Sequence, residues 1–173
     1  WMFRREIGES IIEHVMEFHR EITIAALEEF GDRIDIIFTA DDLGDQVNPF
    51  LSPQLWRDIF KPRYASLFSQ YKRYGVKTMF HSDGNCYPLI PDLIEAGLDI
   101  LNPVQPMARQ MDSAAVKEAF GDRLAFHGTI CIQKTLPFGT PEAVREEVRE
   151  RIRIFSRGGG YVVNTIHNIL ARA

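Results

Sequence analysis

Cysteine, net charge and long apolar runs are all scarce in this sequence of 173 residues. The two cysteines, Cys86 and Cys131, have no CxxC partner, which argues against a disulfide framework and favours free thiols in a reducing cytoplasm. We expect both to be small buried thiols rather than metal ligands. No apolar run approaches the roughly 20 residues that span a bilayer, and no signal peptide precedes the first helical pattern, so a cytoplasmic location away from membranes is expected.

A basic surface is missing too. The formal net charge is -4, and no stripe of lysine and arginine appears that would neutralise phosphates, which argues against a nucleic-acid partner. Lys61, Arg63, Lys72 and Arg73 are spread along one predicted helix and are interpreted as a solvated face. The glycine run at 158–160 precedes a strand pattern, whereas a phosphate-binding loop follows one.

The chain does have a regular alternation of strand and helix patterns. Short apolar runs rich in β-branched residues predict strands, and stretches between N-cap residues and glycines predict helices. Pro62 predicts a kink in the second helix. Strands are predicted over 34–40, 76–80, 98–102, 123–127 and 161–165, and helices over 8–30, 52–74, 88–96, 113–120 and 140–156.

The first helical pattern carries its apolar residues on a single stripe, which is predicted to face the core. Gly31 is predicted to end this helix as a C′ residue. His14 and His19 lie on it, away from any strand end, and are predicted to be surface or packing residues. The stripe consists of Ile11, Ile12, Val15, Met16, Ile22, Ala25, Ala26 and Leu27.

Strands separated by helices throughout the chain predict right-handed βαβ units and a parallel sheet. Two α/β architectures fit this alternation: an open doubly wound sheet, or part of a (β/α)₈ TIM barrel. Because no phosphate-binding glycine fingerprint follows any strand, the pattern favours the barrel.

Polar residues collect where each predicted strand ends. The carboxyl ends of parallel strands share one face, on which barrel enzymes build their sites. Taken singly, each polar residue has a structural interpretation; Asp83, for example, is suited to a turn before Gly84. Taken jointly, their convergence predicts a functional site. The exits are Asp41-Asp42-Leu43-Gly44, His81-Ser82-Asp83-Gly84, Asn102-Pro103-Val104-Gln105, His127-Gly128-Thr129 and Asn164-Thr165-Ile166-His167-Asn168.

At these exits the chain resembles the uroporphyrinogen decarboxylase (URO-D) family, which also holds the cobalamin- and coenzyme M-dependent methyltransferases. The family fold is a (β/α)₈ barrel, so the resemblance implies that residues 1–173 are the C-terminal part, about five βα units, of one barrel domain. An open half barrel leaves two strand edges unpaired, so we expect a chain that folds alone to form a homodimer or to swap elements. The resemblance rests on IIFTADDLG ending at Gly44, MFHSDGN (79–85), LIEAGLDILNPVQ (93–105), FHGTICIQKTLPFGTPEAV (126–144) and GGGYVVNTIHNI (158–169).

The methyltransferase branch of that family holds zinc with a His-x-Cys pair after one strand and a cysteine after the last. The corresponding positions in this chain are His81, Asp83 and His167, which replace the cysteines by residues that also bind zinc. The resemblance then implies demethylation of methoxy compounds or methylamines, with the methyl group passing through a corrinoid carried by a small partner protein. In this interpretation Asp41 and Asp42 handle protons or orient the substrate.

Two alternatives stay open. One is a metal-free decarboxylase of tetrapyrroles, in which His167, Asp41 and Asp42 contact substrate; the sequence ADDLG departs from the first exit of true decarboxylases. The other is a catalytically silent fragment or binding module. In the methyltransferase interpretation, the polar residues predicted to line the pocket are Asn102, Gln105, His127 and Asn164.

Overall fold

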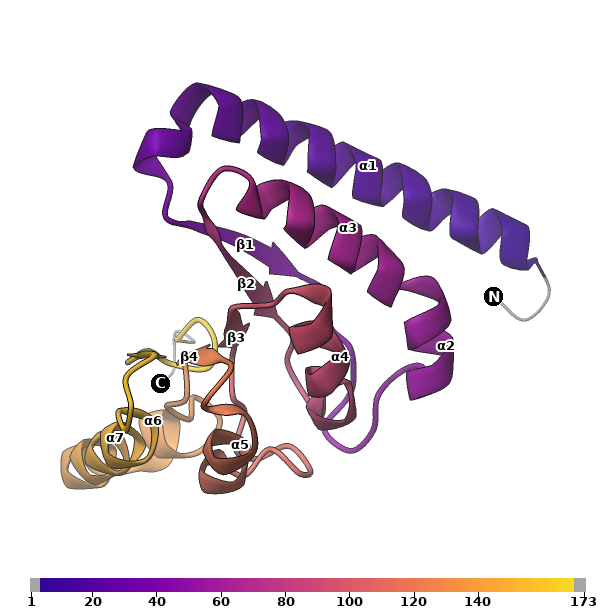
Figure 1. The fold of residues 1–173 in the computed structure, drawn as a ribbon. Coiled ribbons are helices and arrows are strands. Elements are labelled where there is room, and N and C mark those ends of the chain that lie inside the picture. Colours follow the sequence, from indigo (N-terminus) through magenta and orange to yellow (C-terminus); the bar gives the residue numbers. More distant parts are fainter. Residues whose placement is uncertain (1–3, 170–173) are drawn as a thin grey trace.

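A computed structural model describes residues 4–169 of the chain (Figure 1). Its centre is one five-stranded sheet in which each strand pairs in parallel with the next along the chain. All five predicted strands are confirmed, although all except β2 are shorter than predicted. The strands are β1 (Ile36–Ala40), β2 (Lys77–His81), β3 (Ile100–Asn102), β4 (Ala125–His127) and β5 (Tyr161–Val162).

The strand order decides between the two predicted architectures. A doubly wound sheet reverses its strand order at a switch point and has helices on both faces. This sheet runs β1-β2-β3-β4-β5 without a reversal, and right-handed crossovers between sequential neighbours place their helices on the same face. The fold is therefore that of part of a (β/α)₈ barrel, as predicted.

Helices follow the predicted pattern closely. Ser52, Asp112 and Thr140 cap three of them, and each side chain accepts a hydrogen bond of 2.9–3.2 Å from the backbone N–H three residues on. The kink predicted from Pro62 is a break at Phe60 between two helices. The helical elements are α1 (Arg5–Phe30), η1 (Gly31–Arg33), α2 (Pro53–Ile59), α3 (Lys61–Lys72), η2 (Tyr87–Leu89), α4 (Ile90–Ala96), α5 (Ser113–Phe120), α6 (Thr135–Phe138) and α7 (Pro141–Phe155).

The prediction for α1 was wrong in two respects. Gly31 has a φ of -57° and continues into the 3₁₀ turn η1, so it does not adopt the left-handed conformation usual at C′. The single apolar stripe is divided between two faces: Leu27 is buried, whereas Ile11 and Ile22 are 59% and 55% exposed. Figure 1 shows α1 lying along α3, and this one neighbour covers only one side of the helix. No helix within residues 4–169 has the length and apolarity needed to cross a membrane.

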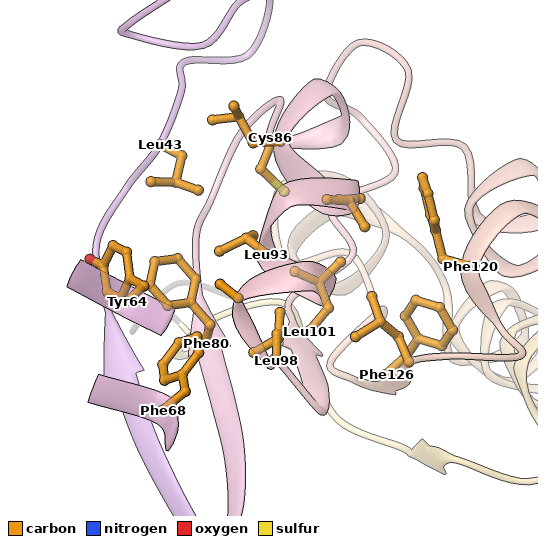
Figure 2. Close-up of a cluster of buried hydrophobic side chains, with 14 of the residues drawn as sticks. Leu43, Tyr64, Phe68, Phe80, Cys86, Leu93, Leu98, Leu101, Phe120 and Phe126 are labelled. Atoms are coloured by element: carbon orange, nitrogen blue, oxygen red, sulfur yellow. The ribbon is translucent and has the colours of Figure 1, made fainter. Parts of the chain in front are cut away.

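The main core lies between the sheet and its helices (Figure 2). Phe80 of β2 points into it and meets the ring of Tyr64 edge-on at 5.1 Å, with Phe68 close by. Both cysteines are buried, as predicted. Burial raises the pKa of the Cys86 thiol to about 12. The opposite face of the sheet is open within the described residues, and Phe38 of β1 is 53% exposed there.

Asp99, just before β3, joins the ends of two elements at the side of the sheet away from the polar strand exits. Its carboxylate accepts hydrogen bonds from Thr78 N (2.9 Å), Thr78 Oγ1 (3.1 Å) and Lys72 Nζ (3.1 Å). Burial alone raises the pKa of Asp99, but these hydrogen bonds outweigh it and hold the pKa below its usual value.

We expect Asp99→Asn to lower the free energy of unfolding by about 1–3 kcal/mol at pH 7, because hydrogen bonds to the charged group are weakened. A depressed folded pKa stabilises the protein above the unfolded carboxyl pKa of about 3.9, and this stabilisation is lost as the pH falls through the folded value. Urea unfolding at several pH values should therefore show the wild type and variant converging below about pH 4. Asp122→Asn, at an exposed carboxylate, is the control and should change stability by less than about 0.5 kcal/mol. Equal stability of Asp99→Asn and wild type at pH 7 would contradict the assignment.

Candidate metal and substrate site

A pocket of about 500 Å³ opens at the carboxyl ends of the strands, where the polar exits were predicted to meet. The structure brings the exits of β2, β3, β4 and β5 to this pocket. Phe38 and Ala40 of β1 form an apolar part of its wall. Five of the residues predicted from the sequence line it: His81, Asn102, His127, Asn164 and His167.

His81, Asp83 and His167 form a cluster suited to a metal ion. One ligand atom from each lies within 4.8 Å of the other two. Nε2 of His81 is 4.0 Å from Oδ2 of Asp83, and the rings of His81 and His167 meet edge-on with centroids 5.6 Å apart. A tetrahedral zinc ion holds such atoms about 3.3–3.6 Å apart, so modest side-chain rotations bring these three into its coordination sphere.

The surroundings of Asp83 also fit a cation. Its Oδ1 atom is buried and has no hydrogen-bond partner among the described residues, an arrangement that is rare for a carboxylate. Burial raises the pKa of Asp83; the neighbouring imidazoles of His81 and His167 oppose this, while the charge of Asp42 adds to it. The donor set of two imidazoles and one carboxylate matches three-ligand zinc sites, which leave one position for substrate.

Backbone hydrogen bonds from two neighbouring exits position the loop that carries Asp83. Oδ1 of Asp42 accepts from Asp83 N at 3.0 Å, and the Ser82 hydroxyl accepts from Leu43 N at 3.0 Å. Gly84 N donates to Oε1 of Gln105 at 2.7 Å. The exits of β1 and β3 therefore hold the loop between them.

Asp41 and Asp42, the predicted proton-handling pair, lie outside the pocket lining. Oδ2 of Asp41 accepts a 2.9 Å hydrogen bond from the Tyr64 hydroxyl. Burial raises the pKa of Asp41, and the hydrogen bond from Tyr64 lowers it. Asp42 is exposed and supports the Asp83 loop. No sequence signal marks Tyr64, because this residue lies within an ordinary helix pattern.

Gln105 is also placed apart from the pocket lining. Its buried amide bonds to Gly84, to Gln46 at 3.1 and 3.2 Å, and to Gln133 at 2.9 Å. These contacts join loops that are distant in the sequence, which makes Gln105 a positioning residue for the rim. A direct contact between Gln105 and substrate stays a prediction.

Asn102 connects the two histidines at the centre of the pocket. Its Oδ1 is 2.6 Å from Nδ1 of His81, and its Nδ2 is 2.7 Å from Nδ1 of His127. Burial lowers the pKa of His127. Nε2 of His127 lies 3.4 Å from Nδ2 of Asn164, on the wall formed by the β5 exit.

A parallel sheet whose polar strand ends surround one pocket places the chain in the class of (β/α)₈ barrel proteins, whose sites lie at this end of the strands. Within that class the particular family is shown by sequence. The family model for Uroporphyrinogen decarboxylase (URO-D) matches residues 7–173. The chain belongs to the uroporphyrinogen decarboxylase family, as its strand exits indicated. No curated protein matches the sequence.

Among solved structures, the chain is similar to a methyltransferase from Methanosarcina mazei, with a TM-score of 0.54 and 20% sequence identity. The match covers 78% of this chain and 38% of the methyltransferase chain. At this identity the similarity establishes the fold. The chain thus spans well under half the length of that protein.

Proposed function

We propose that this chain carries the metal-binding side of a methyltransferase barrel that works in corrinoid-dependent methyl transfer. The observation on which this rests is the cluster of His81, Asp83 and His167, together with the buried Oδ1 of Asp83, which has no hydrogen-bond partner in the described part of the chain. In the family resemblance, these three residues correspond to the zinc ligands of the methyltransferase branch. The Methanosarcina methyltransferase supports the proposal through its fold.

The residues divide into ligands and pocket walls. His81, Asp83 and His167 would hold a zinc ion, which would supply a Lewis acid that lowers the pKa of a bound thiol. A corrinoid carried by the partner protein would supply the methyl group to this acceptor. The chain's own residues orient the acceptor: Phe38 and Ala40 offer an apolar wall, and Asn102, His127 and Asn164 offer polar groups.

Two nitrogens and one oxygen make a harder ligand set than one nitrogen and two sulfurs. A zinc ion in it is more Lewis acidic and leaves a bound thiolate less nucleophilic. A tetrahydrofolate-type nitrogen is therefore proposed as an acceptor in place of the thiol. The proposed partners are a small-molecule methyl donor or acceptor, a corrinoid protein and a second copy of this chain. Proton handling by Asp41 and Asp42 is part of the proposal, although neither is among the residues that line the pocket.

Metal content tests the proposal directly. Protein purified without a histidine tag should contain about one zinc ion per chain by elemental analysis. The double variant His81→Ala/Asp83→Ala should contain none. The matched control removes the same residue types at exposed positions far from the pocket, as His14→Ala/Asp122→Ala, and should keep the wild-type zinc content.

Circular dichroism melts establish that each variant is folded before its zinc is counted. Folded wild type without zinc would overturn the metal-dependent proposal and favour the metal-free decarboxylase alternative. Zinc that survives in the double variant would show that the ion binds elsewhere on the chain.

A further inference from the structure

The buried amide of Asn102 lies between the rings of His81 and His127, and each of its atoms has a fixed role. Its Nδ2 atom is 2.9 Å from the backbone carbonyl oxygen of His127. A carbonyl oxygen only accepts, so the amide nitrogen must face it and Oδ1 must face the other way. The orientation of the amide follows from the backbone alone.

That orientation determines where each imidazole carries its hydrogen. Oδ1 of Asn102 only accepts, and it lies 2.6 Å from Nδ1 of His81, so this nitrogen must carry a hydrogen. The second N–H of Nδ2 points to Nδ1 of His127 at 2.7 Å, so that nitrogen must present a lone pair. Asn102 thus requires a hydrogen on Nδ1 of His81 and a lone pair on Nδ1 of His127.

We propose that Asn102 is a positioning residue that fixes His81 and His127 in opposite tautomers. His81 keeps a lone pair on Nε2, and His127 keeps a hydrogen on Nε2. Metal-binding histidines commonly donate the second ring N–H to an oxygen, which fixes the ring and leaves the other nitrogen for the metal. Nε2 of His81 is the atom that faces Asp83, at 4.0 Å.

His127 then serves the opposite purpose. Its Nε2–H lies 3.4 Å from Nδ2 of Asn164, whose own Oδ1 accepts from Thr165 N at 2.8 Å. Two donors face each other at the pocket wall, and within residues 4–169 neither has an acceptor. The pocket therefore offers N–H groups to an oxygen acceptor of the substrate, such as a carboxylate, opposite the nitrogen ligand of the metal cluster. The use of these groups toward zinc and substrate rests on the proposed function; the tautomers themselves do not.

Long-range ¹H–¹⁵N correlation spectra of the metal-free, histidine-labelled chain test the assignment with both rings neutral. In the wild type His81 should carry its hydrogen on Nδ1 and His127 on Nε2. In Asn102→Asp the ionised carboxylate still accepts from His81 but has no hydrogen to give. His127 should therefore gain a hydrogen on Nδ1 while His81 is unchanged. His14 and His19, exposed on α1, are internal references that should not move.

Wild-type spectra with the same tautomer at His81 and His127 would overturn the proposal, and so would Asn102→Asp spectra in which His127 does not change. Zinc affinity gives a second measurement. Asn102→Leu removes the acceptor for His81 and should weaken zinc binding about 10–100-fold, whereas Asn102→Asp should restore it. Equal weakening in both variants would contradict the positioning role. If the wild type binds no zinc, the proposed function fails while the tautomer spectra still decide this inference.

Discussion

Replacing Asp83 with asparagine should lower the zinc affinity of the chain by more than about 100-fold while leaving it folded. Loss of a residue that only orients a ligand weakens metal binding about 10–100-fold, so loss of a direct ligand should exceed that range. Asparagine has nearly the shape of aspartate and carries no charge. Because Oδ1 of Asp83 is buried and has no hydrogen-bond partner within residues 4–169, the metal-free variant should be at least as stable as the wild type.

Asp42→Asn is the matched control for this experiment. It removes one negative charge from the next carboxylate and keeps an oxygen to accept from Asp83 N, a hydrogen bond of 3.0 Å in the wild type. Competition with a zinc-binding dye should show less than about a tenfold change in affinity for this control, since an exposed charge acts weakly at a distance. Similar losses in both variants would mean that Asp83 contributes general negative charge and is not a ligand.

The strands and the convergence of their exits were predictable because both depend on local features. Runs of β-branched residues such as 34–40 determine where a buried parallel strand forms, and polar residues follow each run directly. The rule that parallel strands end on a common face then places His81 and His167 together, although they are distant in the sequence. The family resemblance added Asp83 to this pair.

What the sequence could not predict depends on which elements become neighbours. The period of α1 identified its apolar residues, but exposure of Ile11 and Ile22 follows from having α3 on only one side. The hydrogen bond from Tyr64 to Asp41 joins a helix to a strand exit, and no local sequence pattern predicts it. Gln105 and Asn102 were both predicted to line the pocket. In the structure both are buried, but Gln105 joins the loops of the rim, whereas Asn102 connects His81 with His127.

The second large effect is expected at a glycine beside the metal cluster. Gly84 has a φ of +75°, and a Cβ atom built on it would lie 2.4 Å from the carbonyl oxygens of Gly44 and Asp45. These are backbone atoms, so they cannot move aside as a flexible side chain would. Gly84→Ala should lower the free energy of unfolding by about 2–5 kcal/mol, combining left-handed strain with overpacking. Its zinc affinity should also fall, because Asp83 is the preceding residue.

Gly158→Ala separates strain from collision. Gly158 has nearly the same φ, +74°, but a Cβ atom there would meet no atom of the described residues within 4 Å. This variant should lose only about 1–2 kcal/mol by urea unfolding and should bind zinc as the wild type does. The difference between the two alanine variants then measures how closely the β1 and β2 exits fit together. Equal stability losses in the two variants, with zinc binding unchanged in both, would contradict this prediction. They would show that the Asp83 loop tolerates displacement and that the close contact of Gly84 with the Gly44 and Asp45 carbonyls does not position Asp83.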